Sequence, residues 1–218
     1  MSFKKKKYTV IRQAISKDLA AFIRNYFCMQ KQVYDTCKAS RYFSPFEQIL
    51  GYYEDKDQQI PDTYSQYANM AMETLLLKCL PDMEKATGLK LYPAYTYARI
   101  YKKGDILKRH KDRFSCEIST TMNLGGDPWP IYLNPNPKAG YTYGPHFGKN
   151  SIQRYSPTKD KGVKVDLKPG DMLVYSGCEL EHWREKFKGK ECVQVFLHYN
   201  NRKTPGAKDN MFDKRPHL

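Results

Sequence analysis

The pattern of hydrophobic and polar positions divides the chain into a helical first part and a strand-rich second part. Before residue 88, apolar side chains recur at steps of three and four, which is the period of an amphipathic helix. From Leu89 onward, β-branched and aromatic residues alternate with polar ones, and turn residues punctuate them. This change of period predicts helices followed by a mainly β core.

The first part predicts one strand and two helices. Residues 8–15 are expected to form a strand, and a helix follows Ser16, whose hydroxyl makes it a suitable N-cap. Residues 41–60 lack a clear period and are expected to be loop. A second helix is expected to begin after Asp62, as N-cap, and to end at Gly88. Each helix carries an apolar stripe that must pack against another element, and a β-sheet is the expected element.

The second part predicts seven strands and one long loop. The strands are expected at residues 91–102, 106–110, 116–124, 129–133, 163–167, 171–175 and 191–199, and the loop at 134–150. Helices followed by strands favour an α+β, mainly β chain: one β-barrel or jelly roll with helices on an outer face. A single domain is predicted, with a supporting strand and helices over 1–88, the β core over 89–200 and a basic tail over 201–218.

Composition narrows the class of protein. The chain has 218 residues, which suits one domain, and no apolar run approaches the ~20 residues of a membrane-spanning helix. No secretion signal is recognised, so a cytoplasmic protein is predicted. The six cysteines have no Cys-x-x-Cys spacing, so reduced thiols are expected rather than a zinc ribbon or a disulfide scaffold.

The net charge of +14 makes nucleic acid a candidate partner. Much of the excess lies at the two ends, in the lysines at positions 4–7 and in the segment that begins at residue 201. Runs of this kind are more often solvated tails than binding faces. The charge therefore leaves the partner open, and the sequence indicates no oligomeric state.

The candidate chemistry begins where the strand at 106–110 ends. His110 and Asp112 are two residues apart, so an extended backbone points both side chains to the same side. A second histidine would complete the two-histidine, one-carboxylate triad of non-haem Fe(II) oxygenases. His182 follows the strand at 171–175 and is best placed to return to the same end of the barrel. The other histidines are the runner-up His198, inside a strand, then His146 and His217.

Taken together, these motifs resemble one enzyme superfamily. His110-x-Asp112, Gly170-Asp171-x-Leu173-x-Tyr175 and His182, with a basic residue opening the last strand, resemble the 2-oxoglutarate- and Fe(II)-dependent dioxygenases, prolyl hydroxylase-like branch. The resemblance covers residues 95–199. It implies a double-stranded β-helix, the jelly-roll core of that superfamily, with Fe(II), 2-oxoglutarate as cosubstrate and O2; ascorbate is a further candidate. The implied activity is hydroxylation of a prolyl residue in a peptide or protein.

The resemblance also implies a cation for the distal carboxylate of 2-oxoglutarate, because a buried carboxylate without a partner is costly. Lys190 is the first candidate. It precedes a strand in which Cys192, Gln194 and Phe196 share its face, so it is expected to point into the barrel. Arg184 and Lys188 remain alternatives.

Three further cosubstrate contacts are expected. The resemblance implies a hydroxyl from Tyr101, which begins the segment leading to His110. Thr121 and Asn123 lie on the polar face of the strand at 116–124. Asn123 stands near a position where the branch often carries a tyrosine, which leaves the identity of this contact open.

The sequence says least about the substrate. The tyrosine-rich segments 49–53 and 140–143, with Trp129, are expected to form walls or lids for an extended peptide. A nucleic-acid oxidative demethylase of the same superfamily is the alternative enzyme. A jelly roll that binds a ligand without catalysis is the alternative outside enzymes.

Overall fold

The structure is a computed structural model, and it describes residues 3–42, 50–57, 59–143 and 153–215. The helices are α1 Phe3–Lys6, α2 Lys17–Ala39, α3 Met70–Thr87 and the 3-10 segments η1 Phe114–Cys116 and η2 Ala207–Lys214. The strands are β1 Tyr8–Ile11, β2 Tyr64–Tyr67, β3 Leu91–Lys102, β4 Leu107–His110, β5 Ile118–Gly126, β6 Ile131–Leu133, β7 Tyr141–Tyr143, β8 Gln153–Tyr155, β9 Val163–Val165, β10 Met172–Ser176, β11 His182–Arg184 and β12 Glu191–Asn201.

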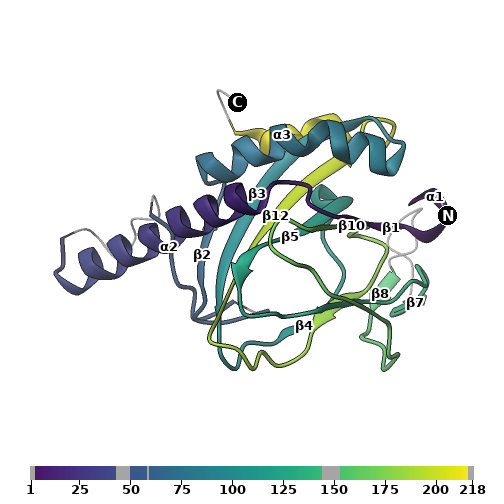
Figure 1. The fold of residues 1–218 in the computed structure, drawn as a ribbon. Coiled ribbons are helices and arrows are strands. Elements are labelled where there is room, and N and C mark those ends of the chain that lie inside the picture. The colour runs from purple at the N-terminus through teal and green to yellow at the C-terminus, as the bar shows by residue number, and fades with distance from the viewer. Residues whose placement is uncertain (1–2, 43–49, 58, 144–152, 216–218) are drawn as a thin grey trace.

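Two antiparallel sheets form a jelly roll (Figure 1). The larger sheet has the strand order β1-β10-β5-β12-β3-β2, and the smaller one has the order β4-β11-β6-β9. The hairpin β7-β8 stands apart from both. Neighbours in each sheet come from distant parts of the chain, as in a double-stranded β-helix, so each sheet assembles only when the whole core folds.

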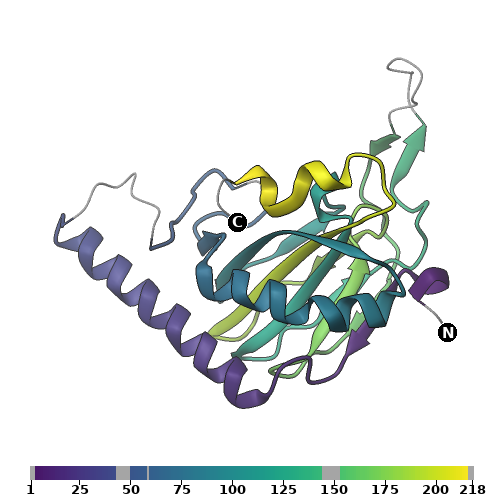
Figure 2. The same ribbon diagram turned by 90° about the horizontal axis from the view of Figure 1, so that it is seen from above.

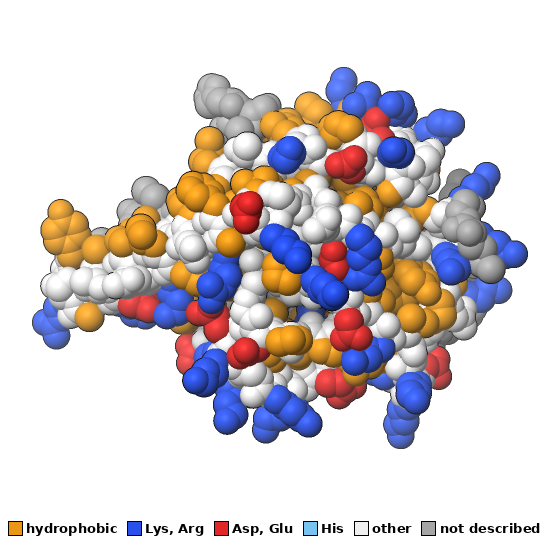
Figure 3. All heavy atoms as spheres, in the orientation of Figure 1, with side chains coloured by type: hydrophobic (Ala, Val, Ile, Leu, Met, Phe, Trp, Pro, Cys, Tyr) orange, Lys and Arg blue, Asp and Glu red, His pale blue; other side chains and the backbone are white. Residues whose placement is uncertain are grey.

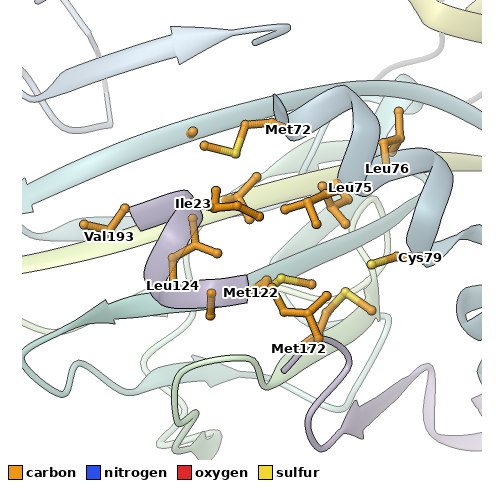
Figure 4. Close-up of a cluster of buried hydrophobic side chains, with 14 of the residues drawn as sticks. Ile23, Met72, Leu75, Leu76, Cys79, Met122, Leu124, Met172 and Val193 are labelled. Carbon is orange, nitrogen blue, oxygen red and sulfur yellow. The ribbon is translucent and has the colours of Figure 1, made fainter. Parts of the chain in front are cut away.

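The helices α2 and α3 lie over the outer face of the larger sheet (Figures 1 and 2). Between them and the sheet lies the main hydrophobic core. Figure 4 labels part of this core: Ile23, Met72, Leu75, Leu76, Cys79, Met122, Leu124, Met172 and Val193. On β12, Val193, Val195 and Leu197 are fully buried in this core, on the face of the strand opposite Cys192, Gln194 and Phe196.

The second helix begins later than the sequence predicted. Asp62 is not its N-cap, because the chain pairs as β2 beside β3 before the helix starts. The helix α3 begins after Asn69, whose side-chain oxygen accepts hydrogen bonds from the backbone N–H groups of Ala71 and Met72. Strand pairing has overridden the helical spacing of the residues in β2. Gly88 ends the helix in the left-handed region with φ 70°, as predicted.

The other predicted strands are present with shifted ends, and several short elements were not predicted. β1 is shorter than expected, β11 has only three residues, and β7 and β8 lie within and just after the segment expected to be a loop. Part of the segment 201–218, expected to be a basic tail, is folded onto the sheet. There η2 packs against β3 and β12 beside α3 (Figure 2), and Arg215 pairs with Glu73 at 3.0 Å.

Strand β3 separates the core from the interior of the barrel. On one side, Ala98 and Ile100 belong to the core beneath the helices. The alternate side chains line a cavity between the sheets: Tyr95, Tyr97, Arg99 and Tyr101. Of the described helices, none is long and apolar enough to cross a membrane. None of the six cysteines, all of which lie in the described residues, is in a disulfide bond.

Candidate active site

The cavity between the sheets has a volume of about 350 Å³. Aromatic side chains of β3 form one wall, and His110, Asp112 and His182 lie together in its lining. The structure therefore brings together the three side chains that the sequence singled out as metal ligands.

Strand pairing explains why these three side chains meet. In the antiparallel pair β4-β11, His110 stands directly opposite His182. Asp112 follows β4, and its backbone N–H donates to the carbonyl oxygen of Gly177 at 2.9 Å. Its Oδ1 lies 3.6 Å from Nε2 of His110 and 3.4 Å from Nε2 of His182. One atom from each residue lies within 4.8 Å of the others, a spacing that suits a single metal ion.

Backbone carbonyls orient both imidazoles. Nδ1 of His110 lies 2.7 Å from the carbonyl oxygen of Lys108, and Nδ1 of His182 lies 3.0 Å from that of Leu180. Each Nδ1 therefore carries the proton and donates it, so each Nε2 presents its lone pair to the cavity. Burial, with His182 nearby, lowers the pKa of His110 to about 4. A neutral imidazole is the form that binds metals.

The carboxylate ligand has its own support. Oδ2 of Asp112 accepts a hydrogen bond from Oγ of Ser119 at 2.7 Å, and that Oγ lies 3.0 Å from Nδ1 of His198. The hydroxyl of Ser119 has one proton and two neighbours that only accept, Oδ2 of Asp112 and, at 2.9 Å, the carbonyl oxygen of Cys116. Ser119 donates to the nearer carboxylate and accepts from His198. Burial alone would raise the pKa of Asp112, but the adjacent imidazoles of His182 and His110 hold it below its usual range.

His198, the runner-up ligand, therefore lies on the other side of Asp112 from the two imidazoles. It is buried, lines the cavity and stacks on Tyr95 with ring centroids 4.5 Å apart. With Asp112 and Cys116 it makes a second group of potential ligand atoms within 4.8 Å. Its bond to Ser119 nevertheless makes it a support for the carboxylate.

The prediction that Lys190 points into the barrel is wrong. Its side chain is exposed, and its backbone N–H donates to Oδ2 of Asp127 at 2.6 Å. Lys190 lies in the turn before β12, where the alternation of strand faces does not yet apply. Lys188 is exposed as well. Neither lysine can meet a carboxylate inside the barrel in this arrangement.

Of the three candidates for the cosubstrate cation, Lys190, Lys188 and Arg184, the one that is buried is Arg184. It is two residues after His182 on β11, and its side chain is only 1% exposed. Nη2 donates to Oγ1 of Thr121 at 3.0 Å and to Oε1 of Gln194 at 3.3 Å, and Nη1 donates to the carbonyl oxygen of Trp129. No carboxylate of the described residues pairs with it, and its Nε has no partner there. Burial lowers the pKa of this guanidinium.

Two tyrosines of the cavity lie near both this arginine and the triad. Tyr101 and Tyr175 both line the cavity, and both are among the groups that act on the pKa of Arg184. The ring of Tyr175 packs 4.7 Å from that of His182. Neither hydroxyl has a hydrogen-bond partner in the described part of the chain. Tyr175 belongs to the motif that carried the resemblance, but no role was expected for it from the sequence.

The two polar residues expected on β5 have different places. Thr121 bonds Arg184 and Gln194 inside the barrel. Asn123 does not line the cavity: its Nδ2 donates to the carbonyl oxygen of Leu167 at 2.8 Å, and its Oδ1 accepts from the N–H of Gly125 at 2.7 Å. The predicted contact from Asn123 to a cosubstrate is wrong, because the backbone occupies both ends of its amide.

The predicted aromatic walls are also placed differently. Tyr53 packs on Tyr34 at the helix side, and Trp129 lies behind Tyr101 with ring centroids 4.8 Å apart. Tyr52 reaches the cavity wall only through its hydroxyl, 3.2 Å from that of Tyr97. Residue 49, the side chains of 141–143, His146 and His217 lie outside what the structure describes.

Comparison with known proteins gives similarity in structure but not in sequence. No family model matches the chain, and no curated protein is a significant match. A prolyl-4-hydroxylase from Pseudomonas putida superposes with a TM-score of 0.54 at 14% identity, covering 92% of this chain and 95% of that one. HygX from Streptomyces hygroscopicus, solved with nickel and 2-oxoglutarate, gives 0.58 at 12% identity over 92% and 85%.

A third similar structure belongs to an enzyme of a different reaction. The epimerase SnoN, solved with Fe3+, α-ketoglutarate and nogalamycin RO, gives a TM-score of 0.61 at 10% identity over 91% of this chain and 80% of that one. The superpositions establish the fold, and sequence identities this low leave the reaction open. The chain has the double-stranded β-helix fold of the 2-oxoglutarate- and Fe(II)-dependent oxygenases.

Proposed function

We propose that this protein is an Fe(II)- and 2-oxoglutarate-dependent dioxygenase. His110, His182 and Asp112 would hold the metal, and two imidazole nitrogens with one carboxylate oxygen are the donor set of non-haem Fe(II) sites. The similar structures of HygX and SnoN contain 2-oxoglutarate (α-ketoglutarate) beside a metal, which supports the same pairing here.

The observation that carries this proposal is the buried guanidinium of Arg184. A buried charge without a counter-ion is costly, so such a residue is kept where a ligand supplies the opposite charge. Arg184 shares a strand face with His182, so a dicarboxylate could bind the metal at one end and the guanidinium at the other. Arg184 thus takes the role first expected for Lys190, and Thr121 holds its Nη2 in place.

The other residues would orient the cosubstrate and exclude water. The hydroxyls of Tyr101 and Tyr175 are placed to donate hydrogen bonds to its oxygens. Leu107 and Ile131 give the same part of the cavity an apolar lining. When bound, Fe(II) with 2-oxoglutarate and O2 supplies the oxidising chemistry, and the protein supplies geometry and a dry site.

For the substrate, we propose a prolyl residue in a peptide or protein. Support comes from the shared fold with the Pseudomonas putida prolyl-4-hydroxylase and from the aromatic wall of β3. The net charge does not form one stripe on the face drawn in Figure 3, where Lys and Arg side chains are dispersed among acidic ones. This face therefore gives a nucleic-acid substrate no specific support.

Succinate release tests the proposal. The iron-loaded protein should convert 2-oxoglutarate to succinate, and proline-containing peptides should increase the rate and gain sixteen daltons on proline. His182→Ala should abolish both, whereas Lys188→Ala, which changes an exposed residue, should not. A protein that binds neither Fe(II) nor 2-oxoglutarate would refute the dioxygenase assignment. Turnover stimulated only by methylated oligonucleotides would instead favour the demethylase.

A further inference from the structure

The charges around the cavity indicate the chemistry of the substrate. We propose that the substrate carries a carboxylate, and that Arg99 and Arg113 bind it at the open side of the metal triad. This inference rests on the proposed function, because it assigns the substrate end of the same cavity. It applies equally to an acidic peptide and to a small organic acid, which share this group.

Arg99 is buried in the wall of the cavity. Its side chain is 6% exposed, and it lies between two tyrosines on the face of β3 that lines the cavity. Its Nη2 bonds Oδ2 of Asp57 and lies 3.4 Å from the hydroxyl of Tyr97. Its Nη1 has no hydrogen-bond partner among the residues that the structure describes. An unsatisfied buried donor is unfavourable, and a bound acceptor would satisfy it.

Asp57 does not compete for the cavity side of Arg99. It does not line the cavity, and its Oδ1 accepts hydrogen bonds from the backbone N–H groups of Gln59 and Ile60 at 2.7 and 3.2 Å. The carboxylate is therefore fixed in the loop behind the arginine. This arrangement orients the guanidinium and leaves one of its edges for a ligand.

Arg113 has the same kind of surroundings as Arg99, but it packs on Tyr95, the neighbouring tyrosine on the cavity face of β3. Its guanidinium carbon lies 4.7 Å from the ring centroid of Tyr95, as that of Arg99 lies 5.0 Å from the ring of Tyr97. Its Nε donates to the hydroxyl of Tyr95 at 3.3 Å, and its Nη2 donates to Asp213 at 3.3 Å. Asp213 also lies outside the cavity lining, and no described residue accepts from Nη1. Each arginine thus combines a tyrosine platform, an outer carboxylate and a remaining donor.

The charges of the loaded site agree with an anionic substrate. Within the described lining, Arg99, Lys111 and Arg113 are cationic, and Asp112 is the one acidic residue. Fe(II) and the 2-oxoglutarate dianion would cancel, and Asp112 would balance Arg184. The cations at the substrate end are then balanced only from outside the cavity, so the potential inside favours an anion. The planar fork of arginine matches the geometry of a carboxylate.

The test compares acids with their uncharged amides on the Ni(II)-loaded protein saturated with 2-oxoglutarate. The probes are hexanoate with hexanamide, phenylacetate with phenylacetamide, and the capped peptides Gly-Glu-Pro-Gly and Gly-Gln-Pro-Gly, with Kd measured by calorimetry. At least one acid should bind ten times or more tightly than its amide. Arg99→Met and Arg113→Met should each remove most of that preference and leave the Kd of 2-oxoglutarate unchanged.

Lys186→Met is the matched control, since it removes one positive charge from an exposed position and should change nothing. Arg99→Lys keeps the charge without the fork and should recover only part of the preference. If Arg99→Met does not fold, Arg113→Met carries the test, because its side chain is 58% exposed and its loss leaves no cavity in the core. A preference confined to the peptide pair indicates an acidic peptide, and one confined to the small acids indicates a small organic acid.

Two results would overturn the inference. Acids that bind no better than amides, or do not bind at all, would show that the arginines do not select a carboxylate. An Arg99→Met variant that loses 2-oxoglutarate instead would make Arg99 a cosubstrate residue. The dioxygenase proposal is judged separately, because binding of Ni(II) and of 2-oxoglutarate is measured before any acid is added.

Discussion

Replacing Arg184 by methionine should weaken the binding of 2-oxoglutarate without lowering the stability of the ligand-free protein. Methionine has a similar length but no charge, so Arg184→Met removes the proposed partner of the distal carboxylate while still filling the space. Lys190→Met is the matched control, because Lys190 was the first candidate from the sequence and is exposed. The two variants have the same net charge, so a difference between them reports the position of the charge.

The magnitudes follow from burial. Breaking a buried ion pair by removing one partner costs about 3–5 kcal/mol, which corresponds to roughly two to three and a half orders of magnitude in the Kd of 2-oxoglutarate. Without the ligand, the guanidinium of Arg184 is a buried charge with no counter-ion, so its removal relieves the cost of keeping that charge out of water. The Tm of ligand-free Arg184→Met should therefore be equal to or higher than that of the wild-type protein. The hydrogen bonds lost to Thr121 and Gln194 reduce this gain.

Thermal unfolding with and without 2-oxoglutarate measures both effects in one experiment. At a concentration of 100 times the wild-type Kd, the ligand stabilises the Ni(II)-loaded wild-type protein by about 2.7 kcal/mol, or roughly 5–11 °C in Tm for a chain of this size. Lys190→Met should show the same shift, and Arg184→Met almost none. An unchanged ligand-induced shift in Arg184→Met, together with a lower Tm in the absence of ligand, would refute the reasoning and make Arg184 a structural residue.

Three other changes test the supports of the site and of the fold. Ser119→Ala removes the hydrogen bond to Asp112 and should weaken metal binding by about 10–100-fold, measured by Ni(II) titration; full affinity would show that the bond is dispensable. Gly177→Ala would place a Cβ 2.3 Å from both Oδ2 of Asp112 and the carbonyl oxygen of Cys116, so the ligand or the backbone beside it must shift and Ni(II) affinity should fall; unchanged affinity would contradict this. Asn69→Ala removes the cap of α3 and should lower the stability by about 0.5–2 kcal/mol without changing the Kd of 2-oxoglutarate; an equal Tm would contradict its role as cap.

The sequence predicted the β core well because alternation along a strand is a local signal. The strand β12 is the clearest example: Val193, Val195 and Leu197 had to share a face, and a buried apolar face needs a partner. The metal triad was accessible for a similar reason. Asp112 follows His110 at the spacing of one strand face, and few histidines were available to complete the set.

The sequence could not place the cosubstrate cation, because the relevant strand is too short to have a period. β11 has three residues, so nothing marked His182 and Arg184 as neighbours on one face. A fully buried arginine also goes against the usual distribution of charged residues, which made the exposed Lys190 the more natural first choice. The start of α3 was misplaced for a different reason, since the pairing of β2 with β3 depends on residues distant in sequence.

The two-sided role of β3 restricts how this protein can change during evolution. Every second residue of the strand faces the cavity, and the residues between them face the core, so an insertion or deletion of one residue would exchange the two sets. Arg99 and its neighbouring tyrosines would then enter the hydrophobic core, and Ala98 and Ile100 would line the cavity. New substrate preferences along this wall are therefore reached by substitution at alternate positions, whereas changes of length are confined to the loops at the ends of the strand.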